Sequence, residues 1–155
     1  MHPFNATRPP GLAVGFAFAG LMPFVTGAIG LWVTPEAWRE WVMEEFLNFA
    51  AVILAFMGAI HWGLAMRAEE GSEQAPMQLG LSVIPPLLGW FALSLPINFA
   101  IPVFFFAFGT LYFADIWAVK QGLAPAWYTA LRRPISLVII SSMIVAWGAT
   151  LVLSY

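Results

Sequence analysis

The sequence contains no cysteine and little charge. The absence of cysteine among its 155 residues excludes disulfide bonds, thiolate metal sites and cysteine nucleophiles. Only 9% of the residues are charged, whereas an ordinary soluble domain has roughly 25%. The formal net charge is −2, so the chain offers neither a basic surface for nucleic acid nor an acidic tail for a cationic partner.

Recognisable catalytic and cofactor motifs are also missing. His2 and His61 form no metal-ligand set with another His or Cys, and haem ligation by His61 alone has no supporting motif. The chain has no Gly-rich phosphate loop, nucleophile elbow or zinc-peptidase helix. Its only lysine, Lys120, lies at a predicted helix end, so retinal attachment lacks a buried amine. We therefore predict no metal, no cofactor and no catalytic residues, and an enzyme is the least favoured class.

What the sequence has in excess is apolar residues, which make up 61% of the chain. A soluble fold of this size could not bury so much apolar surface, so the excess must face lipid. A helix crossing about 30 Å of hydrocarbon needs roughly 20 apolar residues. We predict an all-α polytopic membrane helix bundle forming a single domain over residues 1–155, with five transmembrane helices at 11–33, 46–66, 77–95, 99–119 and 135–153.

Two details of this arrangement come from local patterns. The first stretch could be a secretory signal peptide cleaved after Ala19, but its apolar run continues to Val33, which favours a membrane span. Residues 34–36 carry the Thr-Pro-Glu signature of a helix start, and Trp and Glu are interspersed after it. This pattern predicts a short interfacial helix near 35–45 that leads into the second span.

The distribution of Lys and Arg sets the expected orientation. If the N-terminus is cytoplasmic, Arg39 is the only basic residue on the opposite side, and the cytoplasmic side holds Arg8, Arg67, Lys120, Arg132 and Arg133. By the positive-inside rule, this predicts the bacterial inner (cytoplasmic) membrane or, in a eukaryote, the mitochondrial inner membrane with the basic side in the matrix. Residues 120–133 then form a cytoplasmic loop that contains Trp127, Tyr128, Arg132 and Arg133.

His61 and Asp115 are ionisable residues within predicted spans, where a charge costs about 2.5–3.5 kcal/mol at the helix centre. Both lie roughly 7–9 Å from the cytoplasmic ends of their helices, and Gln78 and Ser82 reach a similar depth. We predict a polar cluster of these residues with Tyr112, which precedes Asp115 by three. One interpretation is a proton-responsive or ligand-binding pocket. The other is a hydrogen-bonded buttress in which Asp115 meets His61, Tyr112 or a loop arginine.

Two further patterns concern the helices themselves. Pro85 and Pro86 interrupt the third span, and either a broken helix or a static kink around Gly89 and Trp90 explains them. Small residues recur at every fourth position in three spans, which predicts contact seams between helices. The stripes are Gly11, Gly15 and Ala19; Ala55, Ala59 and Gly63; and Ser142, Ala146 and Thr150.

Four segments resemble domain-of-unknown-function family 3429, the transmembrane protein 69-like small inner-membrane proteins. The segments are AVILAFMGAIHWGLA (51–65), LSVIPPLLGWFALSL (81–95), YFADIWAV (112–119) and GLAPAWYTALRRPISLVI (122–139). The resemblance implies an inner-membrane location, adds Trp62 to the candidate site and supports a role for His61 and Asp115. It implies no established activity or cofactor. The signature maps onto Gly58, His61, Trp62, Gly63, Pro85, Trp90, Asp115, Pro125, Trp127, Tyr128, Leu131 and Arg132.

Two functional hypotheses follow. The leading one is a non-enzymatic accessory or assembly factor that packs against another membrane component, because the chain is small and has minimal soluble loops. The alternative is a small transporter or channel, or a binding protein for a hydrophobic ligand such as a quinone or lipid, that uses the His61/Asp115 layer. The expected partners are the lipid bilayer and either another membrane protein or further copies of this chain, with no nucleic acid.

Overall fold

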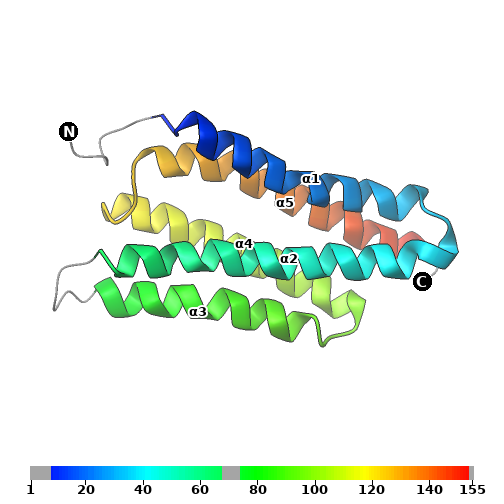
Figure 1. Ribbon diagram of the computed structural model, residues 1–155. Helices are drawn as coiled ribbons and strands as arrows, with labels where there is room; N and C mark the ends of the chain where they lie inside the picture. Colours follow the sequence, from blue (N-terminus) through cyan, green and yellow to red (C-terminus); the bar gives the residue numbers. More distant parts are fainter. Residues whose placement is uncertain (1–7, 68–73, 154–155) are drawn as a thin grey trace.

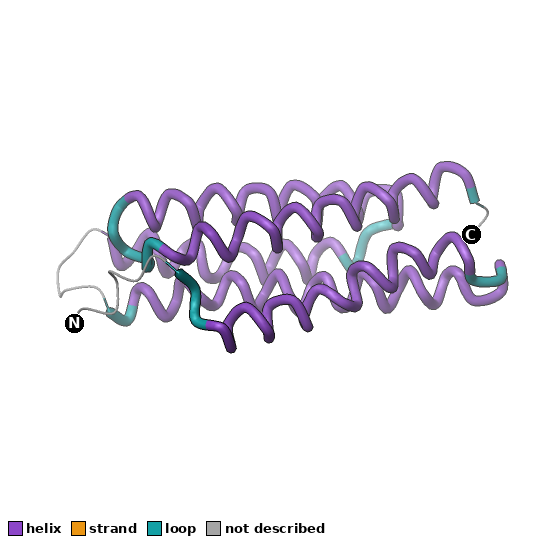
Figure 2. The backbone as a smooth tube through the Cα atoms, turned by 90° about the horizontal axis from the view of Figure 1, so that it is seen from above, coloured by secondary structure: helices purple, strands orange, loops and turns teal. Residues whose placement is uncertain are grey.

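The computed structural model describes residues 8–67 and 74–153, and every regular element in these ranges is a helix. Consecutive helices run antiparallel along a shared direction, as the views from the side and from above show (Figures 1 and 2). This arrangement confirms the predicted all-α bundle. The helices are α1 (Gly11–Val33), α2 (Glu36–Ala65), α3 (Gln74–Ala92), α4 (Ile97–Lys120) and α5 (Trp127–Val152).

Most of these helices suit a bilayer. By length and hydropathy α1, α2, α4 and α5 can each cross a membrane, and only 17–39% of their most apolar windows is buried inside the bundle. The remaining apolar surface faces outward, as lipid contact requires. The third helix, α3, is not among them; it has 19 residues, three of them Pro and two Gln, and lies beside α2 in the same layer (Figure 1).

All eight tryptophans lie toward the helix ends, where Trp is enriched at membrane–water interfaces. Five belong to the end of the bundle that holds the α1–α2 and α3–α4 connections, and three to the opposite end (Figure 1). This distribution supports a membrane placement with the helix axes along the bilayer normal. The first group is Trp32, Trp38, Trp41, Trp90 and Trp147, and the second is Trp62, Trp117 and Trp127.

The predicted interfacial helix near 35–45 is not a separate element, so that prediction is wrong. Instead, α2 is one helix of 30 residues, about 45 Å long. No Pro or Gly interrupts it between Glu36 and Gly58, so the helix continues directly into the apolar span. Its charged first ten residues therefore extend the span beyond the hydrocarbon.

The last helix also begins earlier than predicted. It starts at Trp127 rather than at 135, and Pro134 lies in its interior instead of its first turn. Neighbouring helices can compensate for an interior proline in a membrane helix, which explains why α5 continues through it. The predicted cytoplasmic loop 120–133 is correspondingly shorter, and Trp127, Tyr128, Arg132 and Arg133 all belong to α5.

The adjacent prolines Pro85 and Pro86 do not break α3. Helical conformation continues from Gln74 to Ala92 through Pro85 and Pro86, so of the two explanations of these prolines the broken helix is wrong. Pro86 has no amide hydrogen for the carbonyl of Ser82. That carbonyl oxygen instead lies against α2, since a Cβ added to Gly58 would be 3.1 Å from it. Close packing on a neighbouring helix thus accommodates the prolines.

The core is packed partly through small residues and partly through aromatic rings. Gly58 and Gly89 bring α2 and α3 close together, because an added Cβ would lie 3.1 Å from Pro85 and 3.4 Å from Ala51 respectively. On α1, Phe24 is fully buried and packs edge-on against three other rings, including Phe108 at a centroid distance of 5.9 Å. The core therefore runs through the centre of the bundle.

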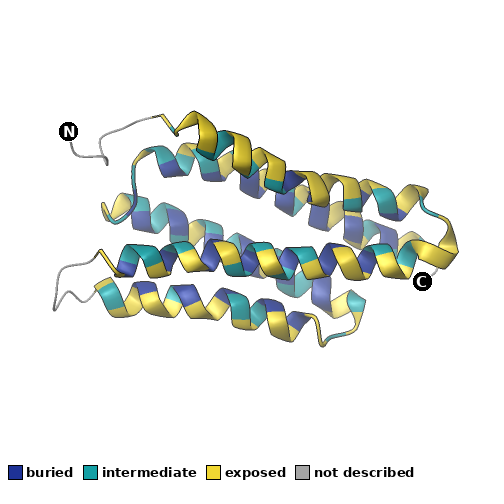
Figure 3. Ribbon diagram, viewed as in Figure 1, coloured by how far each residue is buried: buried dark blue, intermediate teal, exposed yellow. Residues whose placement is uncertain are grey.

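Of the three predicted small-residue seams, one lies in the core and two lie largely outside it. Ser142 and Ala146 of α5 are buried, in agreement with the prediction. The α1 stripe is exposed along its length (Figure 3), so it is not a seam within the bundle. The α2 stripe is also largely outside the core, and Gly63 has no neighbour within 4 Å of an added Cβ. The close α2–α3 contact uses Gly58 instead.

Candidate functional site: a buried charged layer

Four helices each place one polar side chain in a common layer near one end of the bundle. His61 lies close to the end of α2, and Asp115 lies close to the end of α4. Gln78 and Arg132 lie near the starts of α3 and α5, which run in the opposite direction. The four side chains are at most 2% exposed. The antiparallel order of the helices therefore produces the common depth that the sequence predicts.

Asp115 is the centre of this layer. Its Oδ2 accepts a hydrogen bond from Arg132 Nε at 2.5 Å, and its Oδ1 accepts one from the Tyr128 hydroxyl at 3.3 Å. His61 Nε2 lies 3.2 Å from the same Oδ1, close enough for ionic attraction if the ring is protonated, although the two atoms are not aligned as a hydrogen bond. A carboxylate inside a bilayer thus has its charge balanced by a guanidinium.

On its other side, His61 contacts Gln78. Its Nδ1 lies 2.5 Å from Gln78 Oε1, and Gln78 Nε2 is buried without a hydrogen-bond partner. Oxygen and nitrogen of an amide are distinguished only by their hydrogen bonds. With the amide in this orientation, His61 must carry a proton on Nδ1; with the amide rotated, Gln78 would donate to a bare Nδ1. In either orientation one polar atom of the Gln78 amide lacks a partner.

Arg132 connects the charged layer to the apolar core. Its second contact is from Nη1 to the sulfur of Met57 on α2, at 3.1 Å. The guanidinium therefore joins α5 to both α4 and α2. Such a buried ion pair is weak evidence for added stability, because desolvation offsets much of the attraction. It does penalise any arrangement of the helices that separates Arg132 from Asp115.

The structure brings some residues of the predicted cluster together and keeps others apart. The structure brings together His61, Gln78 and Asp115, and Ser82 is buried nearby but bonds to the Leu79 carbonyl of its own helix. The ring of Tyr112 packs against Phe113, and the hydrogen bonds of Asp115 go to Tyr128 and Arg132 instead. Trp62, which the resemblance adds to the site, is 49% exposed, whereas the residues of the layer are buried.

Tyr128 and Arg132 take the places that Tyr112 and Trp62 were expected to fill. The spacing of residues in the sequence contains a pattern that identifies these two residues. Tyr128, Arg132 and Ser136 recur at every fourth position, and all three are buried on one face of α5. The buttress interpretation allows a loop arginine beside Asp115, but a helix that begins at 135 does not include this face. Arg133 lies on the other side and is exposed.

The layer offers a limited set of ligands for a bound group. Among residues 8–67 and 74–153, no three His, Cys, Asp or Glu side chains gather where they could hold a metal ion. What the layer presents is an ion pair, an imidazole and one amide atom with unused hydrogen-bonding capacity. These groups can bind a small polar function or exchange a proton, and they can equally lock four helices together.

Comparisons with known proteins point to one family. The family described as "Protein of unknown function (DUF3429)" matches residues 9–148. "Transmembrane protein 69" from Xenopus tropicalis is 28% identical over 137 residues, which cover 87% of this chain and 53% of that protein. The protein of the same name from Mus musculus is 27% identical over 138 residues, covering 88% of this chain and 55% of its own length. The chain thus spans about half the length of these relatives. No solved structure matches it.

Proposed function

Since the chain belongs to the DUF3429 family of integral membrane proteins, we propose that it is an accessory protein that packs laterally against another membrane component. The proposal concerns a surface rather than a catalytic centre. Its contact surface is the outer face of the first half of α1, defined by Gly11, Gly15 and Ala19 and called the α1 stripe below.

The observation that carries this proposal is that the α1 stripe is exposed on the outside of the bundle. The first buried residue of α1 is Leu21, so none of residues 11–20 belongs to the core (Figure 3). A Cβ added to Gly11 or Gly15 would meet no atom within 4 Å. In lipid, helices associate mainly through close packing at small residues, because the hydrophobic effect does not drive them together. An outward stripe of this kind supports docking of a transmembrane helix from another chain.

We expect the α1 stripe to crosslink to its partner in native membranes. The cysteine-free sequence provides a clean background, so Gly15→Cys can be labelled with benzophenone maleimide and irradiated, which joins the labelled thiol to C–H bonds of whatever chain lies beside it. Phe113→Cys is the matched control, because this residue of α4 is 69% exposed at a comparable depth. The expected result is one defined adduct from Gly15→Cys and none from Phe113→Cys, with loss of that association in Gly15→Leu.

The result that counts against the proposal is equally specific. If Gly15→Cys gives no adduct beyond that of Phe113→Cys, and Gly15→Leu co-purifies with the same components as the unaltered protein, the α1 stripe faces only lipid. An adduct of twice the chain's mass would identify the partner as a second copy of this chain.

We also propose that the membrane is the bacterial inner membrane, or the mitochondrial one in a eukaryote, with the basic end facing the cytoplasm or matrix. Lys120 is the last residue of α4 and Arg133 lies near the start of α5. Both are exposed, and their positive charges support this orientation. In intact bacterial cells, a membrane-impermeant maleimide is expected to label Ser94→Cys and to spare Gln121→Cys. Both positions are exposed and lie at opposite ends of the bundle. The reverse labelling would overturn the orientation.

A second candidate function is favoured by the incomplete hydrogen bonding of the charged layer. A buried amide atom of Gln78 without a partner costs about 1–3 kcal/mol, which a bound polar group or a transferred proton could recover. On this hypothesis His61→Ala and Asp115→Asn abolish flux or ligand-induced thermal stabilisation, while Ser82→Ala, which alters a hydrogen bond within α3, leaves both intact. Unchanged flux and stabilisation in folded His61→Ala protein would reject this second function.

A further inference from the structure

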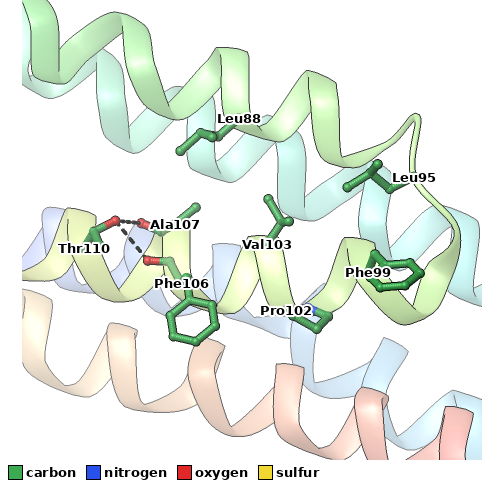
Figure 4. A pocket seen from close by; sticks show the side chains of 8 residues that line it. All are labelled: Leu88, Leu95, Phe99, Pro102, Val103, Phe106, Ala107 and Thr110. Carbon is green, nitrogen blue, oxygen red and sulfur yellow. Dashed lines mark hydrogen bonds between the residues drawn. The ribbon is translucent and has the colours of Figure 1, made fainter.

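A groove runs between α3 and α4 although only a short turn connects these helices. Gly58 and Gly89 hold α3 against α2, and this leaves a lateral opening on the α4 side (Figure 4). The outer part of the groove has a volume of about 500 Å³ and is lined mainly by apolar side chains such as Phe99, Val103 and Phe106.

A smaller chamber continues this groove toward the charged layer. It has a volume of about 150 Å³, and Leu81, Pro85 and Ala114 line it. Leu88, Ala107 and Thr110 line both spaces, so the groove and the chamber adjoin. A dry apolar cavity of roughly 150 Å³ is large enough for a benzene-sized ring, and ligand sites typically measure about 300–1,000 Å³. The two-part shape therefore fits a ring followed by a chain.

The polar groups that border the chamber accept hydrogen bonds rather than donate them. Pro85 has no amide hydrogen, so the Leu81 carbonyl loses its usual donor four residues later, and both residues line the chamber. The hydroxyl of Thr110 already donates to backbone carbonyls, 2.9 Å from Phe106 O and 3.0 Å from Ala107 O (Figure 4). The hydroxyl oxygen of Thr110 can therefore still accept a hydrogen bond, but the group has no further proton to donate. A ligand with a hydroxyl satisfies these groups, whereas one with only carbonyl oxygens does not.

The depth of the chamber restricts the charge of the ligand. Ala114 lies six residues before the end of α4, about 9 Å inside the bundle. A charged head group at that depth is costly, so a phospholipid is a poor fit. We propose that the α3–α4 groove binds an isoprenoid quinol, with the hydroxylated ring in the chamber and the tail along the outer groove. This site is separate from the α1 stripe.

The test compares the two oxidation states of one probe. Purified protein in phosphatidylcholine nanodiscs is titrated anaerobically with decylubiquinol and with decylubiquinone, and binding is followed by quenching of tryptophan fluorescence. We expect the quinol to bind about tenfold more tightly, since one or two hydrogen bonds distinguish the two forms. Decanol, which has a hydroxyl and a chain but no ring, is expected to compete weakly.

Three variants define the outcome. Ala114→Leu fills the chamber and is expected to abolish binding of both forms. Thr110→Val removes an acceptor and is expected to reduce the quinol preference several-fold. Thr26→Val is the control, because Thr26 makes the same backbone hydrogen bond on α1 at 2.9 Å, outside the groove. Equal affinity for quinol and quinone, equal competition by decanol, or full binding by Ala114→Leu or Thr110→Val would each overturn the proposal.

Discussion

Replacement of Arg132 by methionine is expected to lower the free energy of unfolding by about 3–5 kcal/mol, the usual cost of removing one partner from a buried ion pair. Asp115 is 1% exposed, and its Oδ2 bonds to Arg132 Nε at 2.5 Å. Without the guanidinium, this carboxylate is left in the layer with only a tyrosine hydroxyl and an imidazole beside it. Reversible unfolding in mixed micelles, followed by tryptophan fluorescence, measures the change.

Two controls distinguish the loss of the ion pair from a general effect of removing charge. Arg133→Met removes a neighbouring arginine that is exposed, and it is expected to change stability by less than about 0.5 kcal/mol. The double variant Asp115→Asn/Arg132→Met is expected to lose clearly less than the sum of the two single losses, because neither charge is then unpaired. Additive losses, or equal effects of Arg132→Met and Arg133→Met, would show that the pair is not coupled.

The second large effect is expected from Gly58→Val, which we predict to destabilise the protein by about 1–3 kcal/mol, the usual cost of overpacking a core. Even a single Cβ at this position would lie 3.1 Å from the Pro85 ring and 3.1 Å from the Ser82 carbonyl oxygen. Neither neighbour can move easily, because a proline ring is rigid and the carbonyl belongs to the helix backbone. The variant must therefore push α3 away from α2, which the same unfolding experiment measures.

The matched control is Gly63→Val on the same helix. A Cβ at Gly63 meets nothing within 4 Å. Valine is a slightly better helix former than glycine, so this variant is expected to be neutral or slightly stabilising. If Gly58→Val proves as harmless as Gly63→Val, the close approach of α2 and α3 does not depend on glycine. Movement of α3 would also change the α3–α4 groove, so Gly58→Val is unsuitable as a binding-site variant.

The charged layer and the adjacent prolines Pro85 and Pro86 of α3 have a common structural explanation. Each places polar groups inside the hydrocarbon region, where a polar group without a hydrogen-bond partner is costly. Asp115 is compensated by side chains from α2 and α5, and the Ser82 carbonyl lies against the backbone of α2. In both cases a neighbouring helix makes the compensating contact, so these groups restrict which helices pack together.

The positions of the helices along the sequence and the depth of the polar layer follow from the sequence alone. Long uncharged runs are stable only as hydrogen-bonded helices in lipid, and a constant rise of about 1.5 Å per residue converts position into depth. The positions of His61, Gln78 and Asp115 in their helices therefore predict that the three side chains lie at one depth. Predictions from sequence fail at the helix ends, because whether a helix continues through Pro134 or past Glu44 depends on what surrounds it.

Only the tertiary structure decided which side chains meet. The rotation of each helix about its axis places Tyr128 rather than Tyr112 beside Asp115, turns Trp62 outward and leaves the α1 stripe exposed. Periodicity within one helix identifies a face, but it does not say whether lipid, another helix or another chain covers that face. That choice depends on packing energies summed over all five helices, which no single segment of sequence contains.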